Sequence, residues 1–260
     1  MKSKRLAFMG SLSYDEKIFV SMIYDRIIAA QENFKSGYTF FLGEEKLRLA
    51  EQTAAAMSFE SFMLYGGYDE AQRVIMGIFP SGDKPDKADF PIKALKLSFR
   101  KGGGLTHRDF LGAILSLGIE RDTIGDINVG DDCAYVFAHE TAARQILLEL
   151  NRVGRESVSV SEDFALEQMP GRRFESISGT LSSFRIDSVV SLALKCSRKK
   201  AQELVEAGLV SINGRVVCKV SAKVNESDSF SVRGHGKFIL DEIGKTTKKE
   251  RTFIGLKKFI

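Results

Sequence analysis

Apolar side chains recur every three to four positions in two stretches of the first 70 residues, and this spacing predicts helices. Ser13 precedes the first stretch and forms a capping-box pattern with Glu16, which marks a helix start. The apolar face of this helix is predicted to contain Ile18, Phe19, Met22, Ile23, Ile27 and Ile28. A second helix is expected around residues 44–57. We therefore predict a helical N-terminal segment over residues 1–70 that supplies core packing and no chemistry.

Strand and helix patterns alternate between residues 71 and 165. Strands are predicted at residues 74–79, 92–99, 124–129, 133–138 and 157–160. Thr106 and Asp109 form another capping-box pattern before an apolar helical face that Gly118 ends, and a further helix is expected over residues 141–152. Helices between antiparallel strands predict a small α+β sandwich, RRM-like or ferredoxin-like, with its helices on one face of the sheet.

A linker is expected over residues 166–179 and a third domain over residues 180–260, so the whole chain is predicted to be α+β. Ser197 is predicted to cap a helix that Gly208 ends. The Asn213-Gly214 pair lies between two apolar runs, which is a strong hairpin signal. The remaining elements are expected to be a short helix at 187–194 and strands at 229–233 and 252–254.

Composition narrows the class of protein. Hydrophobic residues make up 43% and charged residues 28% of the 260 residues, as in ordinary globular proteins. No apolar run is long enough to cross a bilayer, and the three cysteines form no C-x-x-C pair. We therefore expect a cytoplasmic protein without a membrane partner, a disulfide framework, a metal site or a cofactor.

Charge is distributed unevenly along the chain. Residues 180–260 contain 16 Lys and Arg against 8 Asp and Glu, a net charge of +8, whereas the rest of the chain has a net charge of −4. A basic end on a slightly acidic body is typical of proteins that bind polyanions. The charge pattern therefore favours a nucleic-acid partner for the third domain.

Three cations follow Ser197, in the first turn of a predicted helix, where the helix dipole disfavours them unless an anion binds there. Further cations follow the hairpin turn and occupy a Gly-rich bend, and few aromatic residues lie among them. This arrangement favours recognition of structured RNA by shape over stacking on unpaired bases. The candidate RNA-binding residues are Arg185, Ser197, Arg198, Lys199, Lys200, Asn213, Arg215, Lys219, Arg233, His235 and Lys237.

These residues carry a resemblance to a known module. Arg185-Ile186-Asp187, Ser197-Arg198-Lys199-Lys200-Ala201, Gly208-Leu209-Val210, Asn213-Gly214 and Val232-Arg233-Gly234 resemble the S-four RNA-binding domain (αL motif). The resemblance implies that a helix pair and a hairpin bind structured RNA. Ser227-Asp228 departs from the Gly-Asp that is usual before the last strand, which puts the conformation of that turn in question.

A second resemblance covers the middle of the chain. Residues 105–112, 117–121 and 124–127 resemble the YlmH family of bacterial proteins, in which a middle domain precedes an S-four domain. The resemblance implies binding to rRNA and tRNA on the large ribosomal subunit and a role in ribosome-associated quality control of stalled nascent chains. Members were also linked to cell division. We expect a monomer.

Two motifs leave alternatives open. His107-Arg108-Asp109 looks like a kinase catalytic loop, but Ile114 stands where the kinase Asn is required. Asp109 is then a capping residue, while His107 and Arg108 are candidates for a second RNA or partner surface. Asp187 is expected to be either a helix N-cap or an ion-pair partner inside the basic face.

Three functions compete at this point. The first is a non-catalytic factor that binds rRNA or tRNA. The second is an RNA-modifying enzyme of the pseudouridine synthase or methyltransferase type, but the sequence has neither the catalytic Asp motif of the synthases nor a Gly-rich cofactor loop. The third is an interaction protein of the division machinery. The sequence favours the first, with no catalytic residues.

Overall fold

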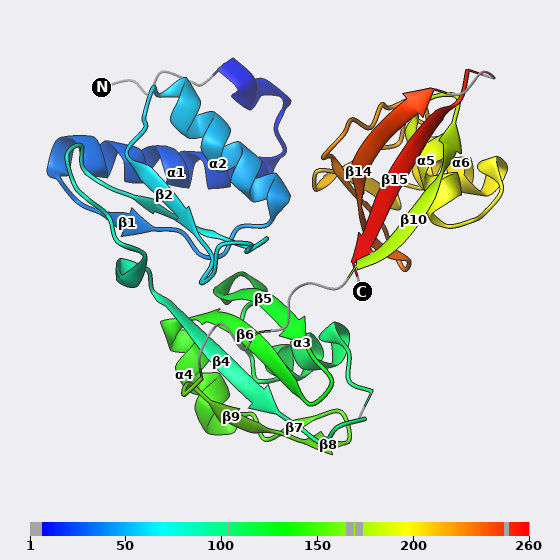
Figure 1. The fold of residues 1–260 in the computed structure, drawn as a ribbon. Helices are drawn as coiled ribbons and strands as arrows, with labels where there is room; N and C mark the ends of the chain where they lie inside the picture. The colour runs from blue at the N-terminus through cyan, green and yellow to red at the C-terminus, as the bar shows by residue number, and fades with distance from the viewer. Residues whose placement is uncertain (1–6, 103, 165–168, 170–173, 247–249, 260) are drawn as a thin grey trace. The chain divides into compact units, whose positions relative to one another are not determined.

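The computed structural model describes residues 7–102, 104–164, 169, 174–246 and 250–259. The chain divides into two compact units, Met1–Pro170 and Gly171–Ile260 (Figure 1). Mixed helix and sheet in both units confirms the predicted α+β class.

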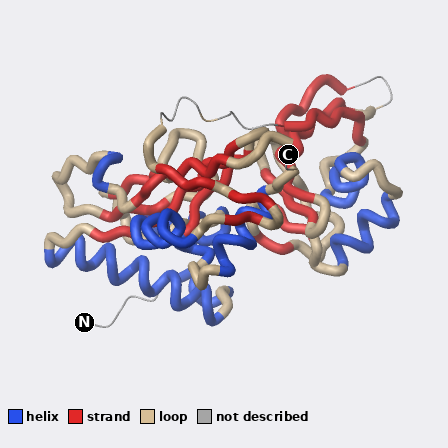
Figure 2. Tube along the Cα trace, turned by 90° about the horizontal axis from the view of Figure 1, so that it is seen from below, coloured by secondary structure: helices blue, strands red, loops and turns tan. Residues whose placement is uncertain are grey.

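The N-terminal part of the first unit packs two helices against a small sheet. Its elements are η1 (Ala7–Ser11), α1 (Tyr14–Asn33), β1 (Gly37–Tyr38), α2 (Glu44–Ala56), β2 (Phe62–Tyr65) and β3 (Ile75–Ile78). The strands are antiparallel in the order β1-β3-β2, and α1 and α2 cover one face (Figure 2). Ser13 and Glu16 form the predicted capping box at the start of α1.

The prediction of a purely helical N-terminal segment was incomplete. β3 was expected in the middle domain, yet it pairs with β1 and β2. Met76 and Ile78 pack under the helices with Ile23 and Ile27, whereas Ile75 faces the opposite side. Because β3 is buried on both faces, its sequence is a continuous apolar run that does not show which strands it pairs with, and its partner β1 lies on the far side of α2 in the sequence.

The middle part has the predicted ferredoxin-like order of elements. It contains η2 (Lys87–Asp89), β4 (Ile92–Ser98), α3 (His107–Ser116), η3 (Arg121–Thr123), β5 (Ile124–Val129), β6 (Cys133–His139), α4 (Glu140–Glu149), β7 (Arg152–Val153), β8 (Glu156–Ser157) and β9 (Ser159–Ser161). The antiparallel sheet order is β5-β6-β4-β9. Phe110 of α3 and Ile146 of α4 join Leu95, Leu97 and Val136 in one core, so both helices cover the same face.

The N-terminal and middle parts are interlocked. Phe41 and Ile75 share a buried cluster with Phe137 of β6. The Phe41 ring lies so close to Gly125 that a Cβ at that position would come within 2.6 Å of it. Glycine is therefore required there, and the two parts form one unit.

Arg73 ties the same two parts together. Its Nε donates a hydrogen bond to the Ile124 carbonyl at 2.9 Å, and its Nη2 donates to the Phe41 carbonyl at 3.0 Å. Burial and the Arg121 charge lower the pKa of Arg73 to about 10, although Asp126 and Asp122 act in the opposite direction. Its guanidinium remains charged at neutral pH.

The second unit is one sheet with two helices on one face. Its elements are β10 (Phe174–Leu181), α5 (Ile186–Ala193), α6 (Arg198–Glu206), β11 (Val210–Ile212), β12 (Arg215–Val216), β13 (Ser229–Val232), β14 (Gly236–Thr246) and β15 (Thr252–Phe259). The strand order is β10-β15-β14-β13-β11-β12, and every pairing is antiparallel. Val189, Val205, Phe230, Leu240 and Leu256 belong to its core.

β10 and β14 were not predicted. β10 begins at Phe174, inside the expected linker, and pairs with β15 from Phe174↔Phe259 to Leu181↔Thr252. Residues 166–168 and 170–173 of that linker lie outside the described residues. The polar alternation of β10 hides its role, because only Ile177 on this strand is buried in the core.

Candidate RNA-binding surface

The start of α6 presents a group of exposed cations. Ser197 caps the helix, its Oγ accepting a hydrogen bond from the Lys200 amide at 3.2 Å. Arg198, Lys199 and Lys200 are exposed, and the first turn contains no acidic residue. The amides of a first helical turn have no partner within the helix. Cations and backbone donors therefore occur together, as an anion requires.

Asp187 holds two of the predicted arginines. Its fully buried carboxylate accepts hydrogen bonds from Arg185 Nε at 3.1 Å and from Arg198 Nε at 2.9 Å. Arg185 Nη2 at 3.3 Å and Gln202 Nε2 at 3.1 Å add two further donors. Arg185 is the N-cap residue of α5, so Asp187 is an ion-pair partner and not the cap.

These contacts outweigh the effect of burial on the carboxyl group. Burial alone would raise the pKa of Asp187, but the hydrogen bonds from Arg198 and Gln202 and the charges of Arg198 and Arg185 hold it below its usual value. Asp187 is therefore ionised at neutral pH. It fixes two guanidinium groups whose side chains stay 36% and 52% exposed, leaving further N–H donors for phosphate oxygens.

The hairpin turn has the predicted geometry. Asn213 and Gly214 both have positive φ, at 47° and 77°, as a tight hairpin turn requires. The Asn213 amide is engaged within the protein: Nδ2 donates to Asp228 Oδ1 at 2.8 Å, and Oδ1 accepts from the Ser229 amide at 2.9 Å. Asn213 therefore holds the turn, whereas Arg215 and Lys219 are exposed, and their contact with RNA stays a prediction.

The Gly-rich bend lies at the other end of α6. Arg233 donates its amide hydrogen to the carbonyl of Leu209, just after the helix, at 2.8 Å. α6 has nine residues, so this bend is about 13 Å along the helix from Arg198. Arg233 and His235 are exposed, and Lys237 lies over the Phe259 ring. The predicted residues thus form separate basic groups and not one cluster of touching side chains.

The middle domain presents His107 and Arg108 in the first turn of α3, both exposed. The Thr106 amide and hydroxyl both donate to Asp109 Oδ2, at 2.8 and 2.6 Å, which confirms the capping interpretation of Asp109. Loss of solvent around its ring and the Arg121 charge lower the pKa of His107, so its imidazole is neutral near pH 7. A contact between these two residues and RNA stays a prediction.

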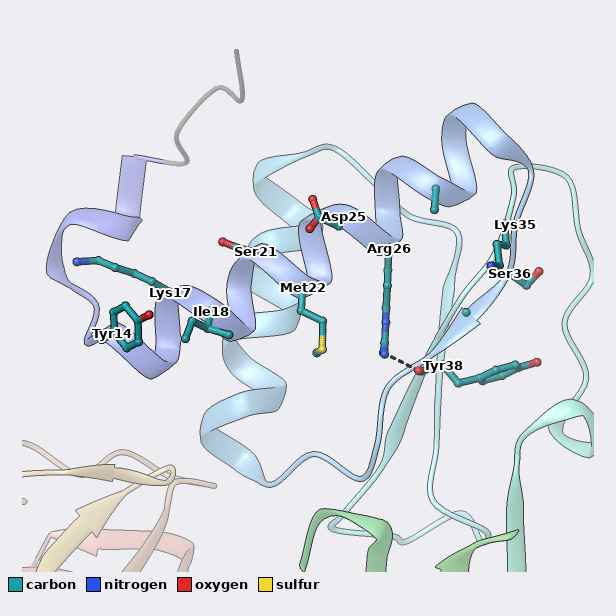
Figure 3. Close-up of a pocket in the computed structure, with 12 residues that line it drawn as sticks. Tyr14, Lys17, Ile18, Ser21, Met22, Asp25, Arg26, Lys35, Ser36 and Tyr38 are labelled. Atoms are coloured by element: carbon teal, nitrogen blue, oxygen red, sulfur yellow. Dashed lines mark hydrogen bonds between the residues drawn. The ribbon is translucent and has the colours of Figure 1, made fainter. Parts of the chain in front are cut away.

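A groove on the N-terminal part was missed by the sequence analysis. It has a volume of about 790 Å³ and lies between α1 and β1, with Tyr14, Ile18, Met22 and Tyr38 among its lining residues (Figure 3). Arg26 crosses it and donates a hydrogen bond to the Tyr38 carbonyl. One wall is β1, a strand that the sequence pattern did not predict. None of the predicted RNA-binding residues lines the groove.

The described residues contain neither a metal-ligand cluster nor a membrane-spanning helix. No three His, Cys, Asp or Glu side chains in this part of the chain gather as a metal ion requires. Likewise, none of the described helices combines the length and apolar character that a membrane span needs.

Known protein families match two stretches of the chain. A family described as a putative RNA-binding domain in YlmH matches residues 85–167. The S4 domain matches residues 184–230, which include α5, α6 and the hairpin. β10 and β15 lie outside the S4 match.

Individual proteins extend this similarity. The chain is 31% identical over 240 residues to ribosome-associated protein quality control protein P2 of Bacillus subtilis, covering 91% of this chain and 93% of that protein. It is 42% identical over 50 residues to ribosomal large subunit pseudouridine synthase B of the same organism, which is 19% of this chain and 20% of the synthase. A solved structure of cell division protein ylmH from Streptococcus pneumoniae has a TM-score of 0.52 at 20% identity, covering 61% of this chain and 97% of that one, so it shares the fold. Because the similarity to protein P2 extends along nearly the whole length of both proteins, the chain belongs to the YlmH family of S4-domain RNA-binding proteins.

Proposed function

We propose that this protein is a non-catalytic, monomeric cytoplasmic factor that binds structured rRNA or tRNA on the large ribosomal subunit during rescue of stalled nascent chains. The main support for RNA binding is the buried Asp187, which fixes Arg185 and Arg198 beside the basic start of α6. Guanidinium groups fixed in this way bind phosphate oxygens without an added cost of ordering them. The ribosomal setting is supported by the name of the Bacillus relative.

A catalytic role has less support. The similarity to the pseudouridine synthase spans 50 residues and one fifth of that enzyme. A shared RNA-binding module accounts for a match of this length. We therefore expect no modified nucleoside after incubation of the protein with transcribed tRNA or rRNA, and detection of one would favour the enzyme alternative.

The test of RNA binding is a salt series with the double variant Arg198→Ala, Lys200→Ala. Each cation that neutralises a phosphate contributes about 0.7–0.9 to the slope of log K against log salt. The double variant should therefore bind ribosomal subunits or tRNA more weakly and flatten the slope by about 1–2 units. A matched double variant, Lys35→Ala with Lys84→Ala, removes the same charge from exposed positions in the first unit and should leave the slope unchanged.

Co-sedimentation separates the ribosomal proposal from a role in division. The protein should sediment with large subunits at low salt and be released as salt rises. If the slope of log K against log salt is equal for the two double variants, the α6 cations are solvated side chains that do not contact RNA.

A further inference from the structure

The sheet of the second unit has a second face, opposite α5 and α6. Ile177, Leu240 and Leu256 point from their strands into the core with the helices. Their neighbours along each strand therefore point outward, since side chains alternate across a strand. The outward residues include Phe174 and Ser176 of β10, Lys237 and Ile239 of β14, and Phe253, Lys257 and Phe259 of β15.

Aromatic rings and cations interleave on this outer face. Phe174 pairs across the strands with Phe259, and the two rings meet edge to face with centroids 5.0 Å apart. Lys257 Nζ lies 5.8 Å from the Phe174 ring centre, and Lys237 Nζ lies 5.3 Å from that of Phe259. Lys257 also pairs with Asp241 at 2.8 Å, so Asp241 offsets part of the charge.

Small residues surround these rings. Ser176, Ser178 and Thr180 face outward along β10. Their side chains are short, so the aromatic rings project beyond them. At the far end, Phe253 lies across from Thr180 and packs against Gly244 of β14. Phe174 and Phe253 remain 37% and 38% exposed. Part of each ring surface is therefore accessible from this face.

We propose that this outer face binds unpaired nucleotides by stacking their bases on Phe174, Phe259 and Phe253, with Lys237 and Lys257 beside the phosphates. Sheets that carry exposed aromatic residues among cations bind single-stranded nucleic acid in this way, because every base has a π-face. Lysine is depleted from protein–protein interfaces, so lysines over the rings favour a nucleic acid as occupant. This inference rests on the proposed function and names the class of RNA.

The face is continuous with the predicted basic residues. Arg233 and His235 occupy the turn between β13 and β14, and Lys237 begins the outer face two residues later. A strand leaving a structured RNA at this bend would run onto the rings. The second unit would then bind one RNA at two places, the structured part at α6 and the unpaired part on the outer face of the sheet.

The chain contains no tryptophan, so Phe174→Trp introduces a unique fluorescent reporter. Stacking of a base on this ring should quench its emission when short unstructured oligouridine is added to the full chain. A blunt RNA duplex should quench it less. Tyr14→Trp, at a 78% exposed position in the first unit, is the control and should not respond to either RNA.

Affinity measurements complete the test. Loss of one stacked ring weakens single-strand binding about 5- to 150-fold, so Phe174→Ala should weaken oligonucleotide binding within this range and leave duplex binding unchanged. Phe174→Leu keeps apolar bulk without a π-face and should give the same loss with an unchanged melting temperature. If the Leu variant binds unpaired RNA like the wild type, or if the wild type binds none, this inference is wrong. The proposed function fails separately, by unchanged salt slopes in the α6 double variant.

Discussion

Asp187→Asn would add one positive charge to the RNA-binding unit, yet we expect it to weaken RNA binding. If net charge alone governed affinity, removing an acid would strengthen binding. In the structure, however, this carboxylate is what fixes Arg185 and Arg198. The substitution thus separates two explanations of the basic surface that predict opposite changes in affinity.

The size of the effect follows from the contacts. Immobilising a long side chain costs about 0.5–1.5 kcal/mol, so releasing both arginines should weaken RNA binding by about 1–3 kcal/mol, roughly 5- to 150-fold. Removing one partner of a buried ion pair costs about 3–5 kcal/mol of folding stability. Arg185 and Arg198 are partly exposed and regain water, so we expect a smaller loss of about 2–3 kcal/mol for the second unit.

The assay compares Asp187→Asn with Glu203→Gln in the full chain. Glu203 is exposed on α6 and pairs with Lys200, so its substitution adds the same charge without releasing either arginine. RNA affinity should fall for the first variant and stay level or rise slightly for the second. Hydrogen exchange of α5 and α6 amides measures the stability loss. Tighter RNA binding by Asp187→Asn would refute the positioning role.

Acid adds an independent test of Asp187. Its pKa is lower in the folded state, so its stabilising effect is complete above the unfolded value of about 4 and is lost as pH falls through the folded pKa. Hydrogen exchange should therefore show an acid-side loss of α5 and α6 stability in the wild type that is smaller in Asp187→Asn. Equal losses would assign the acid sensitivity to other carboxyl groups.

Two further predictions concern the second unit. A fragment of residues 171–260 should melt cooperatively. A fragment of residues 182–260 should be less stable by about 2–5 kcal/mol or more, because it lacks Ile177 and the β10–β15 pairing. Equal melting curves for the two fragments would contradict this. Ser227→Gly should raise the free energy of unfolding by about 0.5–1 kcal/mol, since Ser227 has a φ of 69°, and a loss of stability in urea titrations would show that the serine is preferred there.

Local signals made the helix starts predictable. Ser13 with Glu16, Thr106 with Asp109, and Ser197 each lie within three residues of the amides or side chains they contact, so their short-range pattern is complete in the sequence. The same holds for the Asn213-Gly214 turn. The positions of Arg198, Lys199 and Lys200 followed directly from that cap.

Long-range pairing made the rest unpredictable. β10 contains one buried residue, Ile177, and the rest of its sequence resembles a polar linker. Only its pairing with β15 shows that it is a strand. The outer face was missed for the same reason, because Phe174 and Phe259 lie at opposite ends of the unit in sequence. Few aromatic residues lie near the cations in the sequence, which argued against stacking. Only the strand register places these rings beside Lys237 and Lys257.

The pairing of β10 with β15 also sets the order of events when the protein is made. β10 is the first strand of its unit to be synthesised and β15 is the last, and β15 completes the sheet between β10 and β14. Contacts between such distant segments form slowly and only after both segments exist. Until β15 has been translated, β10 therefore has no strand partner and β14 has one unpaired edge. A nascent chain that ends before β15 would lack the completed sheet and its outer face, and we expect it to lack the binding of unpaired RNA that we propose for that face.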